Sequence, residues 1–312
     1  MRLMPLLRCL ALLVLAAASP ALADARVRGA VAAPDQYSAQ VAARVLEQGG
    51  NAVDAAVAAA FTLAVTYPEA GNIGGGGFMT LFIDGKSWFL DYRETAPRSA
   101  SRDMYLDRRG EGIENLSLVG ARASGVPGTV LGLWEAHQRF GRLDWAALVE
   151  PAIVLARGFE LSEELASSLR GAERRLGGFE SSRATFFASG APPSAGATFA
   201  QPDLARTLER IRDEGPDGFY RGETADLIAA EMARGNGLIS REDLAAYEAV
   251  WREPITFEYR GYTVHSMAPP SSGGATLALT AHMLETYDLA AVGWHSSQMI
   301  HLLAETWKRA YA

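Results

Sequence analysis

The chain has 312 residues, of which 49% are hydrophobic and 21% are charged, and its formal net charge is -7. This composition is typical of a globular protein and excludes a disordered chain. The mild acidity argues against nucleic acid as a partner, because phosphate backbones bind to basic patches. A chain of this length also buries a core large enough to be stable without crosslinks.

Residues 1–23 have the features of a secretory signal peptide. Arg2 and Arg8 supply positive charge, and the apolar run LALLVLAAA is too short to span a bilayer. Residues 21–23 fit a cleavage signal of the A-x-A type. We therefore expect an exported protein, periplasmic or extracellular, whose mature chain is residues 24–312. Retention of the segment as a membrane anchor is the alternative, and sizing the mature N-terminus decides between the two.

The only cysteine, Cys9, lies inside the predicted signal peptide, so the mature chain has neither disulfide nor thiol chemistry. After the signal peptide, residues 52–67 come closest to a membrane-spanning segment. Asp54 interrupts that apolar run and Pro68 ends it. The sequence therefore predicts no transmembrane segment after the signal peptide.

Two helices are predicted early in the mature chain. The first covers about residues 37–48 and ends at Gly49 and Gly50. Asn51 is a predicted N-cap for the second, and Asp54 lies in its first turn, where the helix dipole favours negative charge. Because this second helix is apolar on all sides, we expect it to be buried.

Four consecutive glycines, numbered 74–77, lead into a predicted β-hairpin. Its strands cover residues 78–83 and 88–90, joined by an Asp84-Gly85 turn. The glycine run lacks the Lys and Ser/Thr of a phosphate-binding loop, and it precedes a strand, whereas dinucleotide-binding loops open a helix. Two interpretations remain: tight packing of backbone against backbone, and a loop that faces a substrate.

A charged cluster of Asp91, Arg93 and Glu94 follows the hairpin. An arginine at the end of a stiff strand suits capture of a small carboxylate, because its planar fork of donors matches two carboxylate oxygens. The other interpretations of Arg93 are a surface ion pair, which contributes little, and a buried pair with Asp91 or Glu94.

Helices are predicted through much of the remaining chain, and Ser240 begins a near capping box before a short one. The other predicted helices cover residues 127–140, 144–155, 202–213, 222–233, 274–289 and 296–311. Pro151 is expected to disturb or kink its helix. A second hairpin pairs residues 255–259 with 262–265. Residues 171–200, rich in Gly, Ser, Ala and Pro, predict an irregular surface stretch and no domain boundary.

The remaining polar candidates carry no local catalytic or metal-binding signature. None of the five histidines forms H-E-x-x-H or pairs with cysteine, so we predict no metal site and no cofactor. Ser271 and Ser272 precede a predicted helix, where a cap and turn role is a simpler interpretation than anion binding. No G-x-S-x-G elbow is present, although a Ser-His-Asp triad stays open because triads assemble in space.

Several sequence blocks, in order along the chain, resemble the gamma-glutamyltranspeptidases, also called glutathione hydrolases. The four main blocks are GGNAVDAAVAAAF from Gly49, GNIGGGGFM from Gly71, DYRETAP from Asp91 and PPSSGGATLAL from Pro269. Three weaker blocks are GVPGTVLGLWEAHQRFG from Gly125, FYRGETADLIAAEM from Phe219 and GLISREDLAAY from Gly237. The ordered set extends over nearly the whole mature chain, so the resemblance is specific.

The resemblance implies an α+β fold, the four-layer αββα sandwich of the N-terminal nucleophile hydrolases, of which this chain is the incomplete N-terminal part. It implies transfer of γ-glutamyl groups from glutathione and related compounds to water, amino acids or peptides through a threonyl acyl-enzyme. It also implies that Arg93, within DYRETAP, binds the α-carboxylate of the γ-glutamyl substrate.

The nucleophile threonine of the family lies in a T-T-x-[YF]-like block that this sequence lacks. We therefore assign no catalytic residue here. We expect residues 24–312 to be the large-subunit part of a precursor, truncated at its C-terminus, whose small subunit supplies the threonine. Alone, this part is expected to be inactive, with exposed apolar surface. The alternatives are a cephalosporin or other β-lactam acylase of the same fold, and a non-catalytic exported amino-acid-binding protein.

Overall fold

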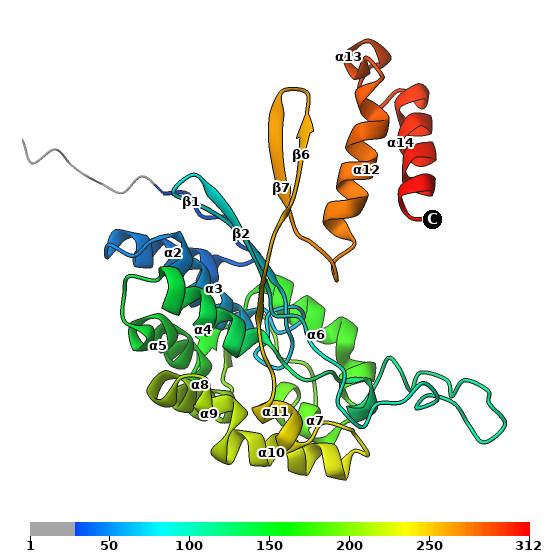
Figure 1. Cartoon of the computed structure of the whole chain (residues 1–312). Helices are drawn as coiled ribbons and strands as arrows, with labels where there is room; N and C mark the ends of the chain where they lie inside the picture. Colours follow the sequence, from blue (N-terminus) through cyan, green and yellow to red (C-terminus); the bar gives the residue numbers. More distant parts are fainter. Residues whose placement is uncertain (1–28) are drawn as a thin grey trace, which may run out of the picture.

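The computed structural model describes residues 29–312, and the predicted signal peptide, with Cys9, lies outside this range. Most helices pack into one body, and a β-hairpin with further helices stands beside it (Figure 1). No helix within residues 29–312 is long and apolar enough to cross a membrane.

The elements agree with the α+β prediction. The helices are α2 Gln36–Glu47, α3 Ala52–Thr66, α4 Thr129–Phe140, α5 Trp145–Ala156, α6 Glu163–Leu176, α7 Glu180–Phe186, α8 Pro202–Glu214, α9 Asp217–Tyr220, α10 Gly222–Arg234, α11 Arg241–Ala245, α12 Gly273–Glu285, α13 Leu289–Val292 and α14 Ser297–Ala310. The strands are β1 Phe78–Ile83, β2 Lys86–Asp91, β3 Phe159–Glu160, β4 Thr198–Phe199, β5 Val250–Arg252, β6 Ile255–Tyr259 and β7 Tyr262–Ser266.

The first two helices begin at side-chain caps. At α2, the Asp35 carboxylate accepts the N–H of Ser38 at 2.7 Å. At α3, Asn51 and Asp54 form the reciprocal capping box that their spacing allows, with Asp54 accepting the Asn51 N–H at 2.9 Å. Asp54 also accepts the N–H of Arg142 at 3.0 Å, which ties the start of α3 to the loop after α4. Each such cap contributes about 1 kcal/mol to stability.

Helix α3 is buried in the middle of the body, as its apolar sequence predicts. Phe61 is fully buried and meets the edge of the Trp145 ring on α5, with centroids 5.4 Å apart. The Trp145 indole donates to the carbonyl of Ile211 on α8 at 2.9 Å. Burial of such large rings is the main source of stability here, because each aromatic side chain removes much apolar surface from water.

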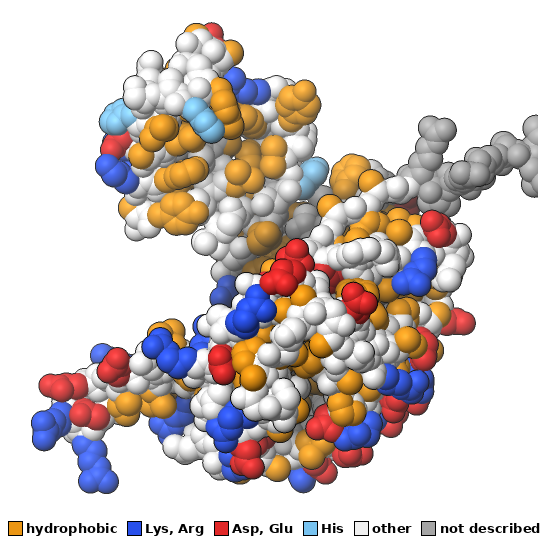
Figure 2. Space-filling model, turned by 180° about the vertical axis from the view of Figure 1, so that it is seen from behind, with side chains coloured by type: hydrophobic (Ala, Val, Ile, Leu, Met, Phe, Trp, Pro, Cys, Tyr) orange, Lys and Arg blue, Asp and Glu red, His pale blue; other side chains and the backbone are white. Residues whose placement is uncertain are grey.

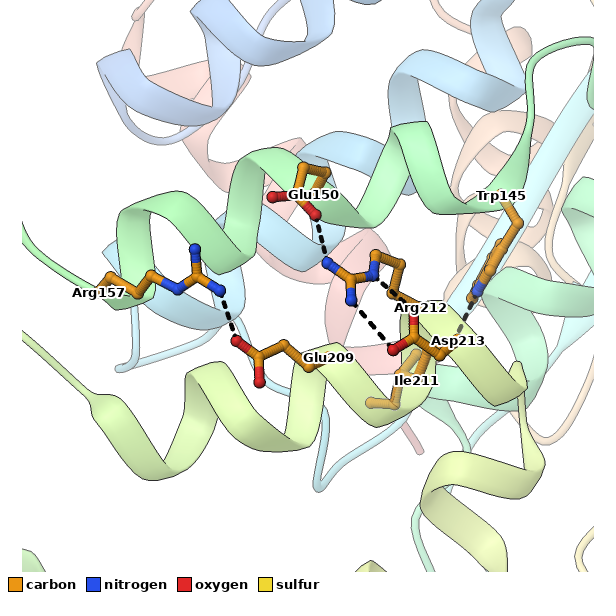
Figure 3. Close-up of polar contacts among 7 residues, drawn as sticks. All are labelled: Trp145, Glu150, Arg157, Glu209, Ile211, Arg212 and Asp213. Atoms are coloured by element: carbon orange, nitrogen blue, oxygen red, sulfur yellow. Dashed lines mark hydrogen bonds and ion pairs between the residues drawn. The ribbon is translucent and has the colours of Figure 1, made fainter.

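Polar contacts along the outside of α5 and α8 align the two helices (Figure 3). Arg212 pairs with Glu150 at 2.7 Å, and Arg157 pairs with Glu209 at 2.7 Å. These pairs are partly exposed, so each is worth at most about 1 kcal/mol. They fix the register of the two helices, while the buried rings supply most of the packing energy.

A three-stranded antiparallel sheet has the order β1-β2-β5. The turn between β1 and β2 uses Asp84 and Gly85, both with positive φ, as the predicted hairpin requires. In this sheet Phe78 lies opposite Asp91, and Phe89 lies opposite Arg252. The pairing of β2 with β5 therefore brings the chain near residue 250 alongside the segment that leads to Arg93.

The hairpin β6–β7 and helices α12, α13 and α14 stand apart from this body (Figure 1). Helix α12 packs against α14 and against the hairpin. Large apolar side chains gather on this part (Figure 2). Those exposed by more than a third include Leu277, Leu279, Trp294, Ile300, Trp307 and Tyr311. The expectation of exposed apolar surface is thus met, and it is concentrated in the last third of the chain.

The predicted irregular stretch over residues 171–200 is wrong for its first half. Helix α6 continues to Leu176, and α7 follows it. Ser162 caps α6, and Leu165 and Leu169 bury one face of it against the core. The sequence of α6, rich in Glu, Leu, Ala and Arg, favours a helix by itself, and the prolines of the stretch lie after α7. Helix α5 likewise continues past Pro151.

Candidate substrate-binding site

Arg93 lies two residues beyond the end of β2 and is exposed to solvent. Its guanidinium carbon lies 5.9 Å from the centre of the Phe78 ring. Among residues 29–312, no carboxylate lies within 4.0 Å of this guanidinium to form an ion pair. The described part of the chain thus leaves the donor fork of Arg93 available to a ligand.

Asp91 is committed elsewhere. Its side chain is buried, and its Oδ2 atom accepts from Nε of Arg252 at 2.8 Å. Its Oδ1 atom accepts the backbone N–H of Arg93 at 3.1 Å. A buried ion pair between Asp91 and the Arg93 guanidinium is therefore excluded, and Asp91 instead holds the backbone of Arg93 while its charge is balanced by Arg252.

The glycine run packs against the arginine segment, as one of its two interpretations requires. Gly77 and Tyr92 exchange backbone hydrogen bonds of 3.2 and 3.0 Å. A Cβ added to Gly76 would lie 2.5 Å from the Tyr92 carbonyl oxygen and 2.9 Å from Cα of Arg93. No side chain fits at such distances, so glycine is required for this close approach. Around Gly74, by contrast, nothing lies within 4 Å of an added Cβ.

The same loop also meets the start of α4. The Gly75 carbonyl accepts the N–H groups of Gly128 and Thr129 at 2.7 and 3.0 Å. It thereby satisfies two backbone donors at the helix start that have no partner within the helix. Burial raises the pKa of the nearby Tyr92 phenol to about 12. Tyr92 is therefore a neutral packing group of the site at ordinary pH.

The other residues considered in the sequence lie away from Arg93 or serve the backbone. The Ser271 hydroxyl accepts the N–H of Gly273 at 3.2 Å, which is the turn role that we preferred. His137 contacts the Leu143 carbonyl, and His265 contacts the Thr256 hydroxyl. Within residues 29–312, no group of three or more His, Cys, Asp or Glu side chains is arranged to hold a metal ion.

Two residues of this site were not singled out from the sequence. Tyr247 donates from its hydroxyl to the Arg93 carbonyl at 2.9 Å, and Arg252 pairs with Asp91. Tyr247 is the last residue of the weaker block GLISREDLAAY, which marks the segment without indicating a partner. Arg252 lies in a strand of three residues, too short to be recognised by alternation of apolar and polar residues.

The family model for Gamma-glutamyltranspeptidase matches residues 38–312. The chain belongs to the gamma-glutamyltranspeptidase family. A solved gamma-glutamyltranspeptidase from Pseudomonas nitroreducens, complexed with L-DON, is 55% identical with a TM-score of 0.87, over 91% of this chain and 84% of that one. This similarity confirms the predicted fold class, the N-terminal part of the N-terminal nucleophile hydrolase sandwich.

Two further proteins to which the chain is similar differ in their named activity. The glutathione hydrolase proenzyme of Pseudomonas aeruginosa is 55% identical over 96% of this chain and 54% of its own length. A solved cephalosporin acylase from Bacillus halodurans is 29% identical with a TM-score of 0.79, over 88% of this chain and 52% of that chain. The chain thus spans about half the length of the curated relatives that it matches.

Proposed function

We propose that this chain forms the large-subunit side of a γ-glutamyl-binding pocket in a glutathione hydrolase and γ-glutamyltransferase. The observation that carries the proposal is the exposed guanidinium of Arg93, on a backbone held by Asp91 and the glycine run. The glutathione hydrolase relatives support the choice of γ-glutamyl compounds, glutathione among them, as substrates.

In this proposal Arg93 binds the α-carboxylate of the γ-glutamyl donor through two parallel charge-assisted hydrogen bonds. Anchoring the amino-acid head places the γ-carbonyl at a fixed distance from Arg93, which lowers the entropic cost of reaction. A hydroxyl nucleophile then attacks that carbonyl and forms an ester, while the amide C–N bond breaks and the leaving amine takes up the proton of the hydroxyl. With glutathione as donor the leaving amine is that of cysteinylglycine, and water or an acceptor amine then cleaves the ester and releases the glutamyl group. The nucleophile is the threonine of a second subunit, cut from the same precursor.

The second subunit covers the apolar surface of α12, α13 and α14 in this proposal. The relatives named as proenzymes are about twice as long as the matched region, which supports a further segment of the precursor as this partner. The predicted signal peptide supports export before processing, to the periplasm or the outside of the cell.

The decisive experiment compares Arg93→Lys with Arg102→Lys in the full-length gene product, with a γ-glutamyl anilide as donor. Lysine keeps the charge but loses the bidentate fork, so KM should rise by about tenfold or more. Arg102, whose side chain is 97% exposed, is the matched control and should leave KM unchanged. An unchanged KM in Arg93→Lys would remove the assignment, and hydrolysis by residues 24–312 alone would contradict the need for a partner.

A β-lactam acylase is the second candidate, because a cephalosporin acylase shares this fold. Glutaryl and adipyl groups also end in a carboxylate that Arg93 could bind, but they lack the α-amino group of a γ-glutamyl donor, so a substrate panel separates the two functions. Preference for γ-glutamyl over glutaryl or adipyl amides supports the first proposal, and the opposite preference supports the acylase. Tight binding of glutamate to the isolated chain, measured by calorimetry, would instead favour a non-catalytic binding protein.

A further inference from the structure

The backbone carbonyl of Arg93 is held by a residue far away in the sequence. The hydroxyl of Tyr247 donates to this oxygen at 2.9 Å, and the two residues are 154 positions apart. Tyr247 follows α11 and is 7% exposed. Burial raises the pKa of its phenol, and the nearby carboxylates of Asp91 and Glu94 raise it further. Tyr247 therefore remains protonated, and able to donate, at ordinary pH.

The Tyr247 hydroxyl packs closely against the start of α4. A Cβ added to Gly128 would lie 2.1 Å from this hydroxyl oxygen and 2.1 Å from the Tyr92 carbonyl. On the other side, the Tyr247 ring stacks on Tyr220 at 5.8 Å with an interplanar angle of 5°. Tyr220 is itself fixed by a hydrogen bond from its hydroxyl to the Pro127 carbonyl at 2.9 Å.

The amide of Arg93 is held by the same distant segment, through Asp91. The N–H of Arg93 donates to Oδ1 of Asp91, and Arg252 holds the second oxygen at 2.8 Å. Arg252 belongs to β5, the strand that pairs with β2. In the sequence, Arg252 follows Tyr247 by five positions. One short segment, residues 247–252, therefore fixes the groups on both sides of the Arg93 Cα atom.

We propose that Tyr247 and Arg252 are positioning residues for Arg93, which aim its guanidinium at the substrate carboxylate. This inference rests on the proposed function, since it requires that Arg93 binds the donor. The glycine run fixes the third side of the same segment, because Gly76 lies directly against Cα of Arg93. With its backbone fixed on three sides, the direction of the Arg93 Cα–Cβ bond is set before a carboxylate binds, so no backbone freedom at this residue has to be lost on binding, and such preorganisation strengthens binding.

Tyr247→Phe tests the inference in the full-length gene product, because it removes one hydroxyl and keeps the ring stack. KM for the γ-glutamyl anilide should rise by about threefold to tenfold with kcat little changed, since weaker positioning weakens ground-state and transition-state binding alike. The matched control is Tyr220→Phe, which removes a buried hydroxyl bonded to Pro127 in the same stack but makes no contact with Arg93. Equal KM effects in the two variants would assign Tyr247 to general packing and overturn the inference.

A double-mutant cycle separates this inference from the proposed function. If Tyr247 acts through Arg93, then Tyr247→Phe should change KM little in an Arg93→Lys background, whereas additive effects would overturn the inference.

Should Arg93→Lys itself leave KM unchanged, the proposed function fails first. Hydrogen exchange in the peptide that contains Arg93 then reports positioning without any need for activity. Faster exchange there in Tyr247→Phe and Arg252→Gln, with no change in Tyr220→Phe, supports the positioning role of Tyr247 and Arg252, and unchanged exchange contradicts it.

Discussion

The segment around Arg93 and the α12–α14 part of the chain differ in how closely the rest of the chain packs against them. Around Arg93, backbone contacts are so close that Gly76 and Gly128 leave no room for a Cβ atom. On α12–α14, by contrast, aromatic side chains such as Trp294 and Trp307 are half-exposed or more. The comparison teaches that the described residues hold the backbone around Arg93, the proposed binding residue, in place by themselves, while the apolar surface of the last helices remains uncovered within the described residues.

The largest expected effect separates a core ring from an exposed ring of the same type. Phe61→Ala should lower the free energy of unfolding by about 3–5 kcal/mol, because it leaves a cavity beside Trp145. Phe82→Ala is the control, since Phe82 is 66% exposed and its removal should cost less than about 1 kcal/mol. Urea unfolding measures both values, and equal losses would contradict the packing described for α3.

Alkaline pH should lower the stability of the folded protein, in part through Tyr92. The pKa of Tyr92 is raised to about 12 in the folded protein, from 10.0 in the unfolded chain. Its contribution to stability is therefore complete below pH 10 and is lost as the pH rises from about 10 to 12, a loss of about 2–3 kcal/mol. Tyr92→Phe should weaken this pH dependence of unfolding, and an unchanged dependence would show that Tyr92 is not the source.

A smaller effect tests the close approach of backbone to backbone. Gly128→Ala places a methyl group against Tyr247 and Tyr92, and should destabilise the protein by about 1–3 kcal/mol. Gly74→Ala is its control, because the space around Gly74 is open and no loss is expected. Thermal unfolding reports both variants, and a tolerated alanine at Gly128 would refute the tight packing at the start of α4.

The smallest effect on folding is expected in the α12–α14 part. Trp294→Ser removes a ring that is 84% exposed and should change the free energy of unfolding by less than about 0.5 kcal/mol. It should still reduce self-association of residues 24–312, because exposed apolar patches promote aggregation. Light scattering of the chain and its variant at equal concentration measures the self-association. No reduction in the variant would mean that Trp294 is not part of the surface through which the chains associate.

Local chemistry explains which features could be predicted from the sequence. The capping box of Asn51 and Asp54 and the turn at Asp84-Gly85 depend on neighbours within four positions, so their residue types indicate them directly. The importance of Arg93 came from the resemblance of its motif, and its binding role stays a prediction. The fold class also followed from the resemblance, and structural similarity to family members confirms it.

Long-range contacts explain what the sequence did not reveal. Tyr247 and Arg252 act on residues more than 150 positions away, and no periodicity in their own segment indicates those partners. The two-residue strands at Phe159 and Phe199 are too short to carry a pattern of alternation. The end of helix α6 was missed because the composition was averaged over residues 171–200, whose Gly, Ser and Pro are concentrated after residue 187, whereas α6 itself is rich in Glu, Leu, Ala and Arg.

The open space at Gly74 offers a practical handle on the proposed site. Because the sequence holds a single cysteine, Cys9 in the predicted leader, a Gly74→Cys substitution would create the sole thiol of residues 24–312. A fluorophore attached there would lie in the glycine loop that packs on the arginine segment, where its emission should respond to arrival of a γ-glutamyl ligand. The loop would thus become an optical reporter of ligand occupancy that needs no turnover at all.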